Sequence, residues 1–217
     1  MQTLGFLGGT GPLGRGLGLR LAQAGHRVLI GSRRAERAAE AVEKVRTKDP
    51  DVDVGGVENP AAAAADIVFI TVPHEAQRAT LTALAPALEG KVVVSCVNAL
   101  AFDERGPHPV LLEAGSAAEE AQALVPGAKI VGAFQNVSAP ALLRVPDPVN
   151  ADALLTGDDP EARATVAGLA GRIPGMRAVD AGPLRLSRPV EELTAVLIAV
   201  NKRYKAHASI RLTDVEL

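Results

Sequence analysis

The chain has 217 residues, 47% hydrophobic and 22% charged, which predicts a folded globular protein with one large domain or a large and a small one. A formal net charge of −2 and an aromatic content of four Phe and one Tyr argue against a nucleic-acid partner, which needs a basic surface or stacking side chains. The single cysteine, Cys96, excludes an internal disulfide and a cysteine metal cluster, and it fits a reducing cytoplasm.

Short apolar runs alternate along the chain with longer Ala-, Leu-, Arg- and Glu-rich stretches of helical period. The apolar runs predict strands over residues 4–8, 26–30, 52–57, 66–72, 91–96, 128–134, 152–156 and 176–179. The first helix follows residue 8, where Leu13, Leu17 and Leu21 lie on one face. The other helices are expected over residues 35–47, 61–65, 75–88, 116–126, 160–172 and 189–207. We expect Pro86 to interrupt the helix over 75–88.

This alternation predicts an α/β fold, a Rossmann-type doubly wound parallel sheet with a smaller C-terminal α/β domain. Prolines at positions 140, 146 and 148 indicate a boundary, which divides the chain into residues 1–140 and 141–217. The segment 98–115 has no regular pattern, and such loops often carry function. The start of the chain lacks a secretory pattern and no apolar run approaches ~20 residues, so we expect a cytoplasmic protein without a membrane partner.

A glycine-rich turn lies between the first strand and the first helix. Its sequence is Gly9-Thr10-Gly11-Pro12-Leu13-Gly14, which matches the G-x-G-x-x-G pattern of dinucleotide sites. Gly9 permits the tight turn, Gly11 lets the backbone approach a pyrophosphate, and Gly14 allows the helix to pack closely. The amides at the helix start would hold the phosphates. The alternative is a glycine turn with a purely structural role.

The end of the second strand indicates which dinucleotide is bound. An NAD site offers a carboxylate there to the ribose 2′-hydroxyl, but this chain has Ser32, Arg33 and Arg34, with Arg37 one turn later. Guanidinium groups bind an extra phosphate that a carboxylate would repel. The sequence therefore predicts NADP, although Arg37 alone could belong to the solvated start of a basic helix.

The remaining reactive side chains form no recognisable catalytic group. The four histidines show no metal-ligand spacing with another His, Cys or carboxylate, so we expect no metal. We expect His26 and His207 at the surface and His74 at the cleft edge or a helix start. Cys96 lies in an apolar run and is expected to be buried. A nucleotide site without an acid or base suits direct hydride transfer between two cofactors, and equally a non-catalytic NADP sensor.

Two later segments are distinctive, DAGPLRLSRPVEELT at 180–194 and NKRYKAH at 201–207. Together with the glycine turn and residues 31–34 they resemble the F420-dependent NADP reductases, over nearly the whole chain. The resemblance implies a Rossmann domain for NADP and a small C-terminal domain that closes a cleft for the deazaflavin coenzyme F420. It implies a reversible hydride transfer between these two small molecules, and a homodimer.

The resemblance also assigns roles to individual residues. Contacts with NADP are implied for Thr10, Gly11, Pro12 and Leu13 at the pyrophosphate, Ser32, Arg33 and Arg37 at the 2′-phosphate, and Val72 and Pro73 beside the nicotinamide. Near the deazaflavin it places Gln135, Asn136 and Val137, and it gives Arg188 and Thr194 roles in placing the cofactors. Gln135 stands where the family commonly has histidine, and Glu192 where some members have a small hydroxyl residue. Glutamine cannot titrate near neutral pH, which weakens a proton relay at 135.

A group of cations near the end of the chain has two explanations. It comprises Lys202, Arg203, Lys205, His207 and Arg211. Positive charge is favoured at a helix C-terminus, and it could also attract the anionic tail of F420.

Two other functions stay open from the sequence: an NADPH-dependent reductase of a ferric or imine acceptor, and a redox sensor without turnover.

Overall fold

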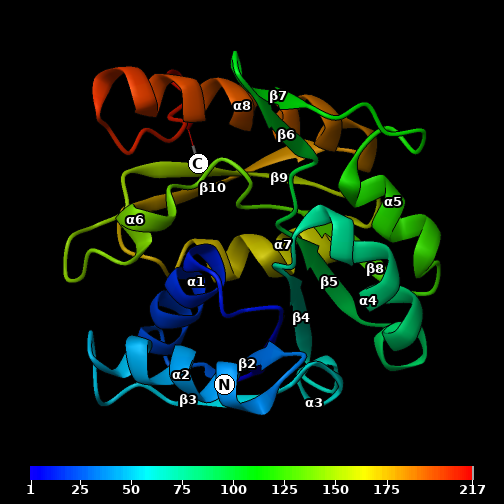
Figure 1. The fold of residues 1–217 in the computed structure, drawn as a ribbon, viewed down its shortest axis with the longest axis vertical. Helices are drawn as coiled ribbons and strands as arrows, with labels where there is room; N and C mark the ends of the chain where they lie inside the picture. The colour runs from blue at the N-terminus through cyan, green and yellow to red at the C-terminus, as the bar shows by residue number, and fades with distance from the viewer. Residues whose placement is uncertain (217) are drawn as a thin grey trace.

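A computed structural model describes residues 1–216. Its main feature is an eight-stranded sheet with the order β10-β9-β8-β5-β4-β1-β2-β3 (Figure 1). Six strands run parallel: β1 (Thr3–Leu7), β2 (Arg27–Ser32), β3 (Val54–Glu58), β4 (Ile67–Ile70), β5 (Val92–Ser95) and β8 (Lys129–Gly132). The order reverses between β3 and β4, so the predicted Rossmann-type doubly wound sheet is confirmed.

Helices cover both faces of the sheet. One face packs against α1 (Pro12–Gln23), α2 (Ala35–Arg46), α6 (Ala139–Leu142) and α7 (Pro160–Ala170). The other packs against α3 (Asn59–Ala63), α4 (His74–Leu88) and α5 (Ala117–Leu124). Strand β4 is buried throughout. Ile67 and Phe69 belong to the apolar core on the side of α1 and α7, and Val68 and Ile70 belong to the core on the side of α4 and α5. The strand predicted over 66–72 is therefore covered on both faces, as its nearly continuous apolar sequence requires.

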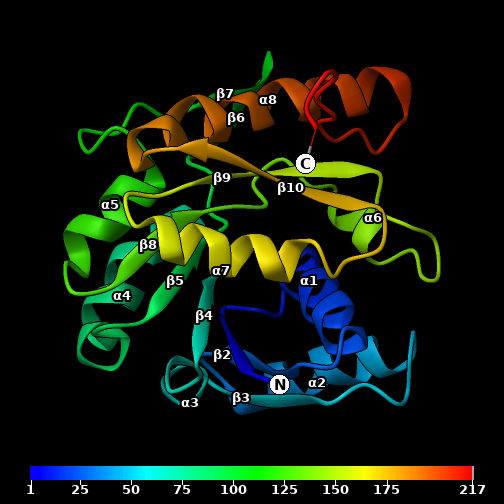
Figure 2. The same cartoon turned by 180° about the vertical axis from the view of Figure 1, so that it is seen from behind.

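The C-terminal part extends the same sheet. Strands β9 (Ala151–Thr156) and β10 (Met176–Gly182) are parallel to each other, and β9 pairs with β8 in the antiparallel direction through Thr156 and Gly132. A short 3₁₀ turn, η1 (Leu184–Leu186), leads into α8 (Ser187–Tyr204), which crosses above β9 and β10 in both views (Figures 1 and 2). The proposed division after residue 140 therefore separates two parts that share one sheet.

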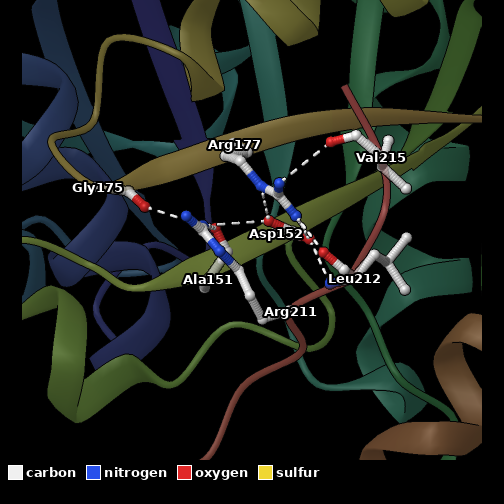
Figure 3. A network of polar contacts seen from close by, with 7 residues as sticks. All are labelled: Ala151, Asp152, Gly175, Arg177, Arg211, Leu212 and Val215. Atoms are coloured by element: carbon white, nitrogen blue, oxygen red, sulfur yellow. Dashed lines mark hydrogen bonds and ion pairs between the residues drawn. The ribbon is translucent and has the colours of Figure 1, made fainter. Parts of the chain in front are cut away.

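The last residues of the described chain are held against β9 and β10. The buried Asp152 carboxylate accepts from Arg177 at 2.7 and 2.6 Å, from Arg211 at 3.2 Å and from the Leu212 N–H at 2.7 Å (Figure 3). Asp152 also donates its own N–H to the Ile210 carbonyl at 2.8 Å. Arg211 was expected in a cationic group at the end of the last helix. That expectation is wrong, because α8 ends at Tyr204 and Arg211 pairs with Asp152 instead.

Three other sequence expectations need correction. The segment 98–115 contains a hairpin, β6 (Leu100–Asp103) and β7 (Gly106–Pro109), whose turn is held by Asp103 Oδ1. Pro86 does not end α4, which continues to Leu88, so the helix tolerates the one N–H donor that Pro86 lacks. His26 is 7% exposed rather than at the surface, because it directly precedes β2 and lies beside α7 and Arg172. Burial and the charge of Arg172 lower the pKa of His26.

Candidate functional site

The glycine turn brings β1, β4 and the start of α1 into close contact. Gly8 has a φ of +67°, and a Cβ there would lie 2.5 Å from Val72 Cγ1. A Cβ on Gly14 would lie 2.6 Å from the Gly9 Cα, so α1 can pack on the turn only because Gly14 has no side chain. A Cβ on Gly11 would meet no atom within 4 Å, so the space above Gly11 is open. This is the arrangement that lets a phosphate approach the backbone.

The start of α1 has little to neutralise its exposed amides. Gly11 is the N-cap residue and provides no side-chain hydrogen bond, Pro12 follows at the first helical position, and the first turn carries no acidic residue. Helix N-termini of this kind attract anions through their amides and partial positive charge. Asn59, which is not among the residues predicted from the sequence, accepts at Oδ1 from the Gly8 N–H at 3.1 Å and fixes the turn from the end of β3.

A hollow of about 520 Å³ joins the glycine turn to the end of β2. Its lining includes Gly8, Thr10, Ser32, Arg33, Arg34, Arg37, Asn59, Val72 and Pro73. The Ser32 hydroxyl accepts from the Arg34 N–H at 3.3 Å and so orients the start of α2. Within residues 1–216 none of the three arginines forms an ion pair, and all three are exposed. Seven residues predicted to contact the nucleotide therefore line one cationic hollow, whereas Gly11, Pro12 and Leu13 are not part of its lining.

A second hollow of about 740 Å³ shares Ser32, Arg33, Asn59 and Pro73 with the first. It continues along the exposed side of α4 past Ala76 to Leu84. The two hollows therefore form a connected surface at the carboxyl ends of β2, β3 and β4. In open α/β sheets, ligands bind at this edge, beside the point where the strand order reverses.

A polar cluster lies where β5, β8 and α8 meet. Directly after β8, Phe134 adopts a φ of +68°, and Gln135 Nε2 donates to the Ser95 carbonyl at 3.2 Å. Asn136 Nδ2 donates to the Val190 carbonyl at 2.9 Å and to Thr194 Oγ1 at 3.0 Å.

Thr194 is a shared partner in this cluster. Its hydroxyl also lies 3.1 Å from Asn98 Oδ1 and 3.1 Å from the Gln135 carbonyl. The structure thus brings Gln135, Asn136 and Thr194 together and adds Asn98. Arg188 does not join them, since it pairs with Glu192 at 2.8 Å on the exposed side of α8.

Some polar atoms of this cluster have no partner in the described part of the chain. They are Ser95 Oγ, Gln135 Oε1 and Asn136 Oδ1, and all three residues are at most 4% exposed. Buried polar atoms are nearly always hydrogen-bonded, so a group of unpaired ones indicates a place for a polar ligand or an ordered water. Val137 follows Asn136 in the chain, is 7% exposed and belongs to the apolar core.

The titratable groups near the site do not form a nucleophile with its base. Burial raises the pKa of the Cys96 thiol, and Cys96 is 3% exposed, which confirms its expected place in the core. His74 starts α4 as expected, with Nε2 3.0 Å from Glu120 Oε2. Burial raises the pKa of Glu191 to about 7, against two backbone N–H bonds that lower it. Across residues 1–216 no group of three or more His, Cys, Asp or Glu is placed to hold a metal, and no helix there could span a membrane.

Comparison with known proteins gives consistent results. The family model described as NADP oxidoreductase, coenzyme F420-dependent, matches residues 3–99. The F420-dependent NADP reductase of Methanocaldococcus jannaschii is 38% identical over 222 residues, with 99% of each chain covered. That of Methanothermobacter thermautotrophicus is 40% identical over 228 residues, covering 99% of this chain and 96% of its own. A crystal structure of a candidate F420-dependent NADP-reductase from Arthrobacter superposes with a TM-score of 0.82 at 26% identity, over 98% of this chain and all of that one.

Proposed function

Because the chain belongs to the F420-dependent NADP reductase family, we propose that it transfers a hydride reversibly between reduced F420 and NADP. The observation that carries this function is the match to two curated reductases at 38% and 40% identity over nearly the full length. NADP and F420 supply the redox chemistry when bound. The protein binds and orients the two cofactors and excludes water, as expected for a site without an acid–base pair.

We propose that the first hollow binds NADP. Thr10, Gly11, Pro12, Leu13 and the amides at the start of α1 would hold the pyrophosphate, because the space above Gly11 is open. Ser32, Arg33, Arg34 and Arg37 would hold the 2′-phosphate, because they line the same hollow without acidic partners. Gly9 and Gly14 would support the turn rather than contact the nucleotide, since both are packed against their neighbours.

We propose that the hydride is exchanged between the first hollow and the polar cluster. Val72 and Pro73 line the hollow at the end of β4 and would contact the nicotinamide. Gln135, Asn136 and Val137 would lie nearest the deazaflavin, with Thr194 holding the Asn136 amide in place. The position of these residues after the carboxyl end of β8, at the edge where ligands of such sheets bind, supports this placement. Arg188 would act at the rim, since its side chain is half exposed and pairs with Glu192.

Mixing the purified protein with NADPH and oxidised F420 tests the reaction directly. We expect the absorbance of F420 in the visible range to fall as the hydride is transferred, and to recover when reduced F420 is mixed with NADP. A protein that oxidises NADPH only with a ferric or imine acceptor would be a reductase of another substrate. A protein that binds NADPH but turns over no acceptor would be a sensor. Either result would contradict the proposed function.

We also propose that the enzyme is a cytoplasmic homodimer and that residues 141–217 close the deazaflavin side of the cleft. Large apolar side chains are exposed on the hairpin and on α8, which pack together: Phe102 (67%), Val196 (55%) and Tyr204 (71%). Such a patch is typical of a protein interface. Light scattering should give twice the mass of one chain, and a double substitution Phe102→Asp and Val196→Asp should give the monomer. A monomeric wild type would contradict this proposal.

A further inference from the structure

Glu191 is a buried carboxylate that joins α8 to α5. It is 4% exposed, and its two oxygens accept from the backbone N–H groups of Ala117 at 2.8 Å and Ala118 at 3.0 Å. Ser116, the N-cap residue of α5, accepts instead from the Glu119 N–H at 3.0 Å. The N–H groups of the first turn of α5, which have no partner within the helix, therefore donate partly to the cap residue Ser116 and partly to a side chain of α8.

The residues on either side of Glu191 contact the polar cluster. Val190 offers its carbonyl, and Thr194 its hydroxyl, to the Asn136 side-chain amide at 2.9 and 3.0 Å. Further back on α8, Ser187 Oγ lies 2.6 Å from Thr156 Oγ1 on β9. The side chains of α8 that meet β9, α5 and the segment after β8 thus follow one another along a single buried face.

From this arrangement, and resting on the proposed function, we propose that Glu191 is a positioning residue for hydride transfer. By accepting hydrogen bonds from the N–H groups of Ala117 and Ala118, Glu191 fixes where α8 lies along α5. It thereby fixes where Val190 and Thr194 hold the Asn136 amide. A glutamine at this position keeps the shape but turns one acceptor oxygen into an NH₂ group that would face a backbone N–H. The helix would then shift, and with it Asn136.

The variant Glu191→Gln tests this proposal, with Asp159→Asn as a matched control. Asp159 is also a carboxylate that binds a helix start: as the N-cap residue of α7 it accepts from the Ala162 N–H at 2.8 Å. It also pairs at 2.8 Å with Lys129, at the opposite end of β8 from Asn136. In single-turnover mixing we expect Glu191→Gln to slow hydride transfer by about ten- to a hundredfold, and in steady-state assays we expect an unchanged KM for NADPH. We expect Asp159→Asn to keep the wild-type rate even if its Tm falls by a similar amount.

A second readout does not depend on turnover. In the ligand-free protein, the NMR signals of the Asn136 side-chain amide should shift in Glu191→Gln and stay unchanged in Asp159→Asn. A wild type that turns over no F420 would refute the proposed function, and the Asn136 signals would then still test the positioning role. Equal rates in Glu191→Gln and wild type, unmoved Asn136 signals, or equal slowing in both variants would overturn it.

The same contact can be removed from the other helix. Ala117→Pro deletes one N–H that binds Glu191, and proline is tolerated at this first helical position after an extended Ser116. We expect slower hydride transfer with an unchanged KM for NADPH, as in Glu191→Gln. If Glu191→Gln does not fold, the rate of Ala117→Pro tests the proposal instead. A wild-type rate in Ala117→Pro would refute the positioning role.

Discussion

At the scale of single residues, the choice of nucleotide depends on a few exposed cations. Arg33 lines both hollows at the end of β2 and has no acidic partner among residues 1–216. We expect Arg33→Ala to weaken NADP binding by about 1.5–3 kcal/mol, the value of a hydrogen bond to a charged group. Calorimetric titration with NADP and with NAD checks this. Binding of NAD, which lacks the 2′-phosphate, should hardly change, and an equal loss for both nucleotides would contradict the assignment.

Glu191 also predicts how stability depends on pH. Burial raises its pKa from 4.5 to about 7 in the folded protein, so the folded state holds this proton more tightly than the unfolded state. Its contribution to the free energy of unfolding is therefore fully present below about pH 4.5 and is lost as the pH rises through about 7. Urea unfolding of wild type and Glu191→Gln between pH 4 and 8 measures this. The stability of the wild type relative to the variant should fall across that range, and a constant difference would contradict the shift.

The residues that could be predicted from the sequence are those whose partners lie close along the chain. The glycine turn and the arginines after β2 depend on local spacing, and the structure brings them to one hollow. Asn59 and Glu191 bind backbone amides 51 and 74 residues away. Such contacts leave no local pattern. A polar residue at the end of a parallel strand could have indicated Asn59, but a glutamate in an amphipathic helix looks like any solvated one.

At the scale of secondary-structure elements, Arg20 connects α1 to the segment that follows α6. Its guanidinium is 2% exposed and donates to the carbonyls of Leu142 at 2.8 Å, Arg144 at 3.0 Å and Asp147 at 2.7 Å. Arg20→Met keeps most of the volume but leaves these carbonyls unpaired, so we expect a loss of about 2–4 kcal/mol in the free energy of unfolding. Arg15→Met is the control on the same helix, because no side-chain hydrogen bond of Arg15 is found in the described residues. Equal stabilities of the two variants in urea would refute this role.

The helices and buried strands could be predicted from the periodicity of apolar residues, whereas the β6–β7 hairpin could not. Strands β6 and β7 are short, and β7 contains Pro107 and Pro109, which normally argue against a strand. The hairpin forms because Asp103 accepts from two backbone N–H groups of the turn and Gly106 adopts a φ of +119°. The two prolines are tolerated because β6 and β7 form a separate two-stranded sheet, in which both strands are edge strands and a missing N–H donor breaks no further pairing.

At the scale of the whole molecule, alternating strands and helices predicted the parallel sheet but not the direction of its last two strands. The connection between β8 and β9, residues 133–150, contains only the short helix α6 and not the long helix that usually forms a parallel crossover. Strand β9 runs antiparallel to β8, and β10 runs parallel to β9. The placement of the chain end on these strands depends on Asp152 and Arg211, which lie 59 residues apart and share no sequence pattern.

The Asp152 cluster predicts how the two parts of the chain unfold. Asp152 is fully buried, and the hydrogen bonds from Arg177 hold its pKa below the usual range. Asp152→Asn removes the charge that pairs with Arg177 and Arg211, and we expect a loss of about 3–5 kcal/mol. Asp180→Asn breaks the pair between the exposed Asp180 of β10 and Arg163 of α7, and should cost about 1 kcal/mol or less.

Scanning calorimetry distinguishes a shared core from two independent domains. One apolar core contains Leu4 of β1 together with Ala153 of β9, so residues 1–140 and 141–217 share buried contacts. Asp152→Asn should therefore lower the temperature of a single transition for the whole chain, because loss of β9 also exposes the core beneath β1 and α1. A variant that shows two transitions, with only the lower one shifted, would mean that the C-terminal part unfolds on its own.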